Sequence, residues 1–163
     1  MDIKIFKASE DDVPLLHKMQ IQSFKVLLNK YKDYDTNPGN ESIEKIIERF
    51  NLPSSTYWLI KSDDITVGGV RVTGKEEGKY RINQIFILPS EQGKGIGQET
   101  FKLLEEYYKD ARSWELDTIL EERGNCYLYE KMGYKKTGPL MKIKEGMTIV
   151  NYEKQTISND ICN

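Results

Sequence analysis

The sequence predicts a single α/β (α+β) domain with a mixed, mostly antiparallel central sheet of about six to seven strands, flanked by helices. Three observations support this fold class. The chain has 163 residues, which is the size of one ordinary domain. Residues 56–88 hold β-rich runs joined by hairpin-like turns, and further along the chain β-rich runs alternate with helical patterns. We expect the domain to span residues 1–154 and residues 155–163 to form a C-terminal tail.

The composition is that of a folded chain and argues against several classes of protein. Lys and Arg total 24 against 26 Asp and Glu, and this net charge of −2 argues against a nucleic-acid-binding protein. The mean hydropathy is −0.62, and no apolar run reaches the roughly 18 residues of a bilayer span. The N-terminus has no pattern of a secretory signal, and Cys126 and Cys162 lack the spacing of a metal site. We therefore expect a cytoplasmic protein that binds no membrane and no metal.

The N-terminal third predicts one strand followed by two helices. Ile3–Lys7 alternates like a short strand, and Ser9 with Asp12 forms the pattern of a capping box at a helix start. A turn-rich segment, 33–39, separates the two helices, and the second helix begins after Asn40. Apolar residues at helical spacing define the expected buried faces, which are Ile21, Phe24, Leu28 and Tyr31 in the first helix and Ile43, Ile46, Ile47 and Phe50 in the second.

The middle of the chain predicts an antiparallel meander of three strands. Thr56–Ile60 and Ile65–Val72 are separated by a four-residue hairpin-like connection, and Tyr80–Leu88 follows a turn that contains two glycines. Pro89 ends the third strand because it cannot donate to a ladder of hydrogen bonds.

The C-terminal half predicts helices and strands in alternation. A long amphipathic helix follows the glycine-rich segment 92–97, and a short helix ends at Gly133, a residue suited to a left-handed cap. The expected elements are a helix with Phe101, Leu104, Tyr108 and Ala111 on one face, a strand at Trp114–Ile119, a helix at Asn125–Met132 and a strand at Met147–Glu153.

The segment Gln92-Gly-Lys-Gly-Ile-Gly97 predicts an anion site between a strand and a helix. Its glycines allow positive φ and remove side chains, so main-chain N–H groups can converge on a phosphate at the positive end of the helix dipole. A glycine-rich turn without a ligand is the alternative. The P-loop pattern is absent, and the dinucleotide fingerprint fails because Gln98 stands where its third glycine belongs. An acidic residue, Asp117, does follow downstream, so a site for a nicotinamide dinucleotide remains a weak second interpretation.

The segment Ile85–Gly97 resembles the acyl-CoA signature of the GNAT N-acetyltransferase superfamily, whose core is matched by Gln92, Gly95 and Gly97. Downstream, Leu128–Tyr134 is similar to the aromatic-Tyr-Glu-Lys-Leu-Gly-Phe segment of the same family. One helix and one strand separate the two motifs, as in the family, and the expected order of elements agrees along nearly the whole chain. The resemblance implies that acetyl-CoA is the acyl donor.

The resemblance also implies which residues hold acetyl-CoA. In relatives, the pyrophosphate lies on the N–H groups of the glycine turn, which here comprises Gln92, Gly93, Lys94, Gly95, Ile96 and Gly97. The pantetheine arm follows the preceding strand at Ile85, Phe86 and Ile87, where that strand diverges from the next, and the N–H near Ile87 can polarise the thioester carbonyl. Asn125 can donate to the same arm, with a helix N-cap as the alternative, because this chain has Glu122 where many relatives have Asn.

The same resemblance implies two catalytic residues. Tyr129 corresponds to the tyrosine that relatives use as a general acid toward the CoA sulfur, and its alternative is a tyrosine of the core. Asp117 is the candidate base for the amine, directly or through a water, and its alternative is a solvated strand residue. Glu115 is a lesser candidate. Tyr31 and Tyr34 lie between the helices that line the acceptor pocket in relatives, so we expect them to contact the acceptor, with a solvated loop as the alternative.

The function that follows from the resemblance is N-acetylation. An acetyl group would pass from acetyl-CoA to a primary amine of a small molecule or peptide, by direct attack in a ternary complex. A non-catalytic acyl-CoA-binding or sensing module is the alternative. A homodimer is compatible with this prediction because many relatives are dimers.

Overall fold

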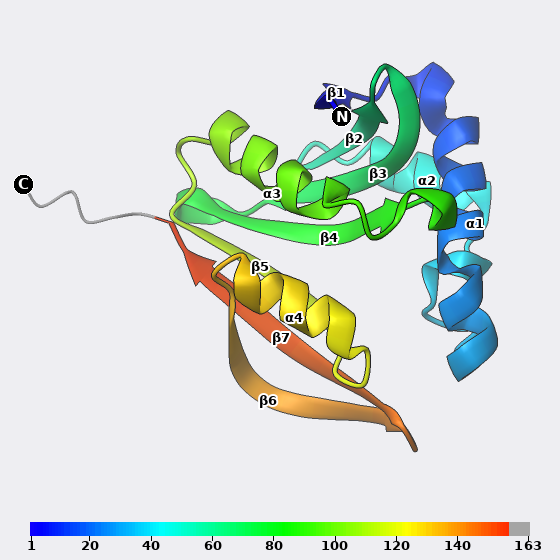
Figure 1. The fold of residues 1–163 in the computed structure, drawn as a ribbon, viewed down its shortest axis with the longest axis vertical. Helices are drawn as coiled ribbons and strands as arrows, with labels where there is room; N and C mark the ends of the chain where they lie inside the picture. Colours follow the sequence, from blue (N-terminus) through cyan, green and yellow to red (C-terminus); the bar gives the residue numbers. More distant parts are fainter. Residues whose placement is uncertain (157–163) are drawn as a thin grey trace, which may run out of the picture.

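The computed structural model describes residues 1–156 and contains a seven-stranded sheet in the order β1-β2-β3-β4-β5-β7-β6, with helices on its faces (Figure 1). All neighbouring strands are antiparallel except β4 and β5, which are parallel. This confirms the predicted fold class. The predicted tail begins inside β7, since Gln155 is the last residue of that strand, and residues 157–163 of the tail lie outside the described range.

Strand β6 was not predicted, and the bounds of the predicted strands and helices agree with the structure to within a few residues. The strands are β1 Ile3–Lys7, β2 Ser55–Ser62, β3 Ile65–Gly74, β4 Lys79–Ile87, β5 Ser113–Ile119, β6 Lys135–Lys144 and β7 Met147–Gln155. The α-helices are α1 Val13–Tyr31, α2 Ile43–Phe50, α3 Ile96–Tyr107 and α4 Arg123–Lys131.

The two larger hydrophobic clusters lie on opposite faces of the sheet because strand side chains alternate, and a smaller one holds Tyr31, Ile119 and Met147. In β3, Val70 and Val72 point into one core, with Phe101 and Leu104 of α3. The other core holds Leu16 and Met19 of α1, Ile46 of α2, and Tyr57, Leu59 and Phe86 of the sheet. Thus α3 and α4 cover one face, and α1 and α2 cover the other.

The parallel pair β4 and β5 is short, and the two strands then diverge (Figure 1). Only Lys79–Arg81 pair with Ser113–Glu115, although β4 continues to Ile87 and β5 to Ile119. The pairing of β3 with β4 changes register between Arg71 and Val72. Asn83 is therefore the extra residue of a β-bulge in β4. We call the gap between the two diverging strands the splay. Its presence agrees with the expected divergence of these two strands.

Several local expectations were wrong. Ile47 of α2 does not face the core but is 42% exposed. Helix α3 ends at Tyr107, so Tyr108 and Ala111 pack beyond the helix rather than on its face. Asn125 lies in the first turn of α4, where Glu122 is the N-cap, so the alternative interpretation of Asn125 as an N-cap was also wrong.

Candidate active site

The glycine turn follows β4 after one short 3-10 turn, Pro89–Glu91, and leads into α3. Gly93 and Gly95 have φ of 79° and 82°, a region that L residues with a side chain rarely adopt. An added Cβ at either residue would find open space, so the backbone conformation, not crowding, requires glycine there. No described residue accepts a hydrogen bond from the amides of Gly93 and Gly95, and the first N–H groups of α3 lack intrahelical partners. The turn therefore presents exposed donors at the positive end of a helix.

Side chains of the turn fix its position. Gln92 Nε2 donates to the carbonyl oxygen of Ile87 at 3.0 Å, which joins the turn to the end of β4. Lys94 Nζ pairs with Glu91 at 3.0 Å and remains half-exposed. Ile96 is buried among core residues. The six predicted turn residues thus form one continuous segment whose first four residues, 92–95, are exposed, while Gln92 and Ile96 anchor it to β4 and to the core.

The C-terminal half of β4 offers a free edge at the splay. Leu88 donates its N–H to the carbonyl of Val67 in β3. Because the main-chain N–H and C=O groups of successive residues alternate in direction along a strand, the main-chain groups of Ile85 and Ile87 point away from β3. On that side, no described strand pairs with β4 beyond Arg81. Phe86 is buried against α1, where it forms an edge-to-face contact with Phe24. The predicted pantetheine residues therefore combine an open main-chain edge with an anchored aromatic ring.

Tyr129 lies in α4 within an aromatic cluster beside the splay. Its ring packs against Phe101, Tyr134 and Tyr152 at centroid distances of 5.8, 6.4 and 6.0 Å. Burial raises the pKa of Tyr129 to about 12, with smaller contributions from Cys126 and Asp117. The phenol therefore stays protonated at neutral pH, which is the state that a hydrogen-bond donor or acid requires.

Asp117 lies on β5 with its carboxylate in an ion pair. Arg81 Nη2 of β4 donates to Asp117 Oδ2 at 2.6 Å. Glu115, two residues before Asp117 on the same face, accepts from Lys75 and lies 4.0 Å from Arg81 Nη1. The structure thus adds two basic residues, Lys75 and Arg81, that sequence reasoning missed. Their positions opposite the acidic residues depend on strand register, for which the sequence has no local signal.

The predicted acceptor residues lie at the end of α1. Tyr31 is buried, and its hydroxyl donates to Glu122 Oε2 at 2.5 Å, beside Lys30 Nζ at 2.7 Å. Tyr34 is 56% exposed in the following loop. The hydroxyl of Tyr31 is therefore bonded to the Glu122 carboxylate and is not free. Tyr34 remains accessible to solvent. Asn125 is half-buried at the start of α4, three residues beyond Glu122.

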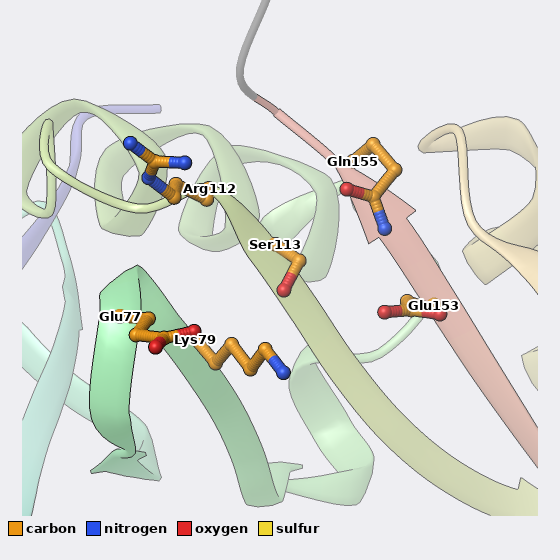
Figure 2. Close-up of a pocket in the computed structure, with 6 residues that line it drawn as sticks. All are labelled: Glu77, Lys79, Arg112, Ser113, Glu153 and Gln155. Carbon is orange, nitrogen blue, oxygen red and sulfur yellow. The ribbon is translucent and has the colours of Figure 1, made fainter.

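A hollow of about 370 Å³ lies at the opposite, paired ends of β4 and β5, away from the glycine turn (Figure 2). It is lined by side chains of both charges from β4, β5, β7 and the segments that precede β4 and β5, namely Glu77, Lys79, Arg112, Ser113, Glu153 and Gln155. The hollow contains none of the predicted site residues, so we place the candidate site at the splay.

Residues 1–156 contain no cluster of three or more His, Cys, Asp or Glu side chains arranged to hold a metal ion. Within the same residues, no helix has both the length and the apolar character needed to cross a bilayer.

The glycine turn, the free β4 edge and the divergent parallel pair are the features of an acyltransferase fold. Residues 23–134 match the Acetyltransferase (GNAT) family, and the chain belongs to this family. It is therefore an acyltransferase, and the acyl-CoA interpretation of the glycine turn is favoured over the nicotinamide one. No curated protein matches the sequence significantly.

Solved structures of N-acetyltransferases share the fold. The ribosomal-protein-S18-alanine N-acetyltransferase from Escherichia coli aligns with a TM-score of 0.77 at 10% identity, covering 98% of both chains. Spermidine N-acetyltransferase from Vibrio cholerae, in complex with CoA and spermine, aligns with a TM-score of 0.74 at 15% identity, covering 94% of this chain and 95% of that one. The PaiA N-acetyltransferase from Thermoplasma acidophilum, in complex with coenzyme A, aligns with a TM-score of 0.71 at 16% identity. The alignment covers 96% of this chain and 100% of that one.

Proposed function

We propose that this protein transfers an acetyl group from acetyl-CoA to a primary amine by direct attack in a ternary complex. One observation carries the proposal: the open main-chain edge of β4 leads, through one short 3-10 turn, into the glycine turn at the start of α3. A long ligand with amides at one end and phosphates at the other matches that arrangement.

The chain's own residues fit acetyl-CoA. The amides of the exposed residues 93–95, which are unpaired among the described residues, and the first N–H groups of α3 suit a pyrophosphate, and glycine at positive φ leaves the space above the turn free of side chains. The edge groups of Ile85 suit the amides of a pantetheine arm, while the carbonyl of Ile87 is already bonded to Gln92. Two of the structural neighbours were solved with CoA bound, which agrees with this assignment.

The amine must lose a proton before it can attack. A lysine-like ammonium has a pKa near 10.4, so only about one molecule in 10³ is nucleophilic at pH 7, which corresponds to about 4–5 kcal/mol. Asp117 is the proposed base, directly or through a water. Arg81 binds Asp117 Oδ2, and within residues 1–156 no hydrogen bond occupies Oδ1, so one oxygen is available to take up the proton.

The leaving group is a thiolate. When the C–N bond forms and the C–S bond breaks, negative charge moves to sulfur. Since the pKa of Tyr129 is about 12 and that of a thiol is near 8.5, full proton transfer would be uphill by about 5 kcal/mol. Tyr129 therefore stabilises the thiolate by donating a hydrogen bond, without giving up its proton.

The test is a thiol-release assay with acetyl-CoA and a panel of primary amines. Thiol release that depends on the amine supports the enzyme, and mass spectrometry should find one acetyl group added to that amine. Stabilisation by acetyl-CoA without turnover of any amine would instead favour an acyl-CoA-binding module. The cytoplasmic location and the homodimer stay predictions, and light scattering after size exclusion tests the second.

A further inference from the structure

A row of three polar side chains crosses the sheet on the face covered by α1 and α2. Tyr57 of β2 pairs with Arg71 of β3, and Arg71 pairs with Gln84 of β4. Directly paired residues have their Cβ atoms about 4.5–5.5 Å apart on one face of a sheet. The row therefore runs continuously from β2 to β4 and ends beside the splay, where the acyl transfer takes place.

Each member of this row has a buried polar atom without a hydrogen-bond partner among the described residues. These atoms are Tyr57 Oη, Arg71 Nε and Gln84 Oε1. Tyr57 is only 2% exposed and Gln84 only 8%. Buried polar groups in native proteins almost always have partners, because an unpartnered one is costly. Three orphaned atoms in adjacent positions indicate a ligand that supplies the missing partners.

The charge of the row is positive. Arg49 of α2 forms an ion pair with Glu41 at 2.8 Å, and Arg81 is paired with Asp117. Among residues 1–156, no carboxylate lies within ion-pair distance of Arg71. Burial lowers the pKa of the Arg71 guanidinium, and the charges of Arg49 and Arg81 act in the same direction, while Tyr57 and Glu41 partly oppose them. An anion at this position would relieve both effects.

We infer that Arg71 binds a carboxylate of the acceptor, and that the acceptor is a free amino acid rather than a polyamine. This inference rests on the proposed acetyl transfer. A guanidinium matches a carboxylate with two parallel hydrogen bonds, and the Tyr57 hydroxyl can donate a third. Gln84 Oε1 accepts from the amine, which then lies at the splay. Neighbouring strands are about 4.8 Å apart, so the two ends of one small amino acid fit between Arg71 and the splay.

The experiment compares matched pairs of acceptors with acetyl-CoA held at saturation. The twenty free amino acids are assayed beside their α-carboxamides, and spermidine serves as the cationic acceptor. Amidation removes the negative charge and makes the amine less basic, so chemistry alone favours the amide. We expect the best free amino acid to exceed its amide at least about tenfold in kcat/KM, and to exceed spermidine likewise.

Three variants assign this preference to Arg71. In Arg71→Gln the acid-to-amide ratio should fall to about one, through a rise of about tenfold in the KM of the amino acid, with the KM of acetyl-CoA unchanged. Arg71→Lys should retain only part of the preference because it keeps the charge but loses the guanidinium fork. Arg112→Gln removes an exposed arginine charge in the distant hollow and should keep the wild-type ratio.

The outcomes separate this inference from the proposed function. Turnover of amides or spermidine at or above the rate of amino acids would overturn the carboxylate subsite and leave acetyl transfer intact. The same ratio in wild type and Arg71→Gln would also overturn it. If acetyl-CoA releases no thiol with any amine, the proposed transfer is wrong. The melting temperature of the CoA-saturated protein then decides whether Arg71 binds a carboxylate, which requires that amino acids raise it and their amides do not. The wild-type comparison remains decisive if Arg71→Gln does not fold.

Discussion

Arg81 Nη2 lies 2.6 Å from Asp117 Oδ2, and this contact joins the last residue of β4 that pairs with β5 to a residue two positions beyond the last paired residue of β5. The ion pair therefore bridges the two strands where they begin to diverge. Both side chains are partly exposed, at 24% and 42%, so the pair contributes little to stability on its own. Its consequence is positional, because it orients the group proposed to receive the proton of the amine.

Replacing Asp117 by Asn should lower kcat/KM for the amine about 10²-fold, because the amide cannot accept the proton at neutral pH. The affinity for CoA should stay within about twofold. Glu153→Gln is the matched control, since it removes a carboxylate from β7 on the same face of the sheet, in register with Glu115 and away from the splay. Equal rates for Asp117→Asn and wild type would show that the proton leaves by another route.

Replacing Tyr129 by Phe should lower kcat about 10²-fold and leave CoA binding by calorimetry unchanged, because only the hydrogen bond to the thiolate is lost. Tyr134→Phe is the control, since its buried hydroxyl lies in the same aromatic cluster without a partner among the described residues. Burial holds the pKa of Tyr129 at about 12, and a group stays protonated below its pKa. Wild-type kcat should therefore not decline between pH 7 and 10 from ionisation of Tyr129, and loss of activity in Tyr129→Phe should be the same across that range.

The parts of this molecule that the sequence predicts well are those with a local physical cause. The strands β1 to β5 follow from β-branched and aromatic runs, and the glycine turn follows from residues that adopt positive φ. The sequence of strand β6 contains no such local signal. Its residues are all exposed, and it contains Gly138 and Pro139, so no buried alternation distinguishes Lys135–Lys144 from a loop. It forms because β7 offers it an edge.

The proposed acceptor subsite was harder to predict for a related reason. The motif around Tyr129 is contiguous in sequence, so one segment is sufficient to identify it. The row of Tyr57, Arg71 and Gln84 comes from three strands, and only the register of the folded sheet brings its members together. A shift of one residue in β3 would move Arg71 to the opposite face. Such a site has no signal in a single sequence.

The glycine turn makes a direct prediction about CoA binding. In Gly95→Ala a side chain is forced to φ of 82°, which costs about 1 kcal/mol and disturbs the amides at the start of α3. We expect calorimetry to give about tenfold weaker binding of CoA. Gly97→Ala is the control, because an added Cβ there would lie 3.5 Å from Leu128 Cδ2, an ordinary contact. Comparable losses in both variants would mean that the strain at Gly95 is not what matters.

Gly68 of β3 controls how closely β3 approaches β4. A Cβ at this residue would overlap the carbonyl oxygen of Phe86 and lie 3.2 Å from Ile87 Cα, both of them backbone atoms. We expect Gly68→Ala to reduce the free energy of unfolding in urea by about 1–3 kcal/mol, and to weaken CoA binding because the free edge of β4 moves. Gly74→Ala in the same strand should cost less, since its Cβ would meet only the ring of Tyr80. A stable Gly68→Ala with unchanged affinity would contradict this account of the close approach.

Glu122 links the stability of the α1 end to pH. Burial raises the pKa of its carboxyl, but hydrogen bonds from Lys30 and Tyr31 outweigh burial, and the net pKa lies below the ordinary 4.5. A pKa that is lower in the folded state contributes stability above the unfolded value and loses it as pH falls through the folded value. We therefore expect Glu122→Gln to destabilise the protein by about 1 kcal/mol at pH 7. In urea titrations this difference from wild type should shrink as the pH falls below 4.5. Lys30→Ala removes only the exposed partner and should have the smaller effect at pH 7. A difference that is independent of pH would show that Glu122 acts through packing, because only its ionised form attracts Lys30.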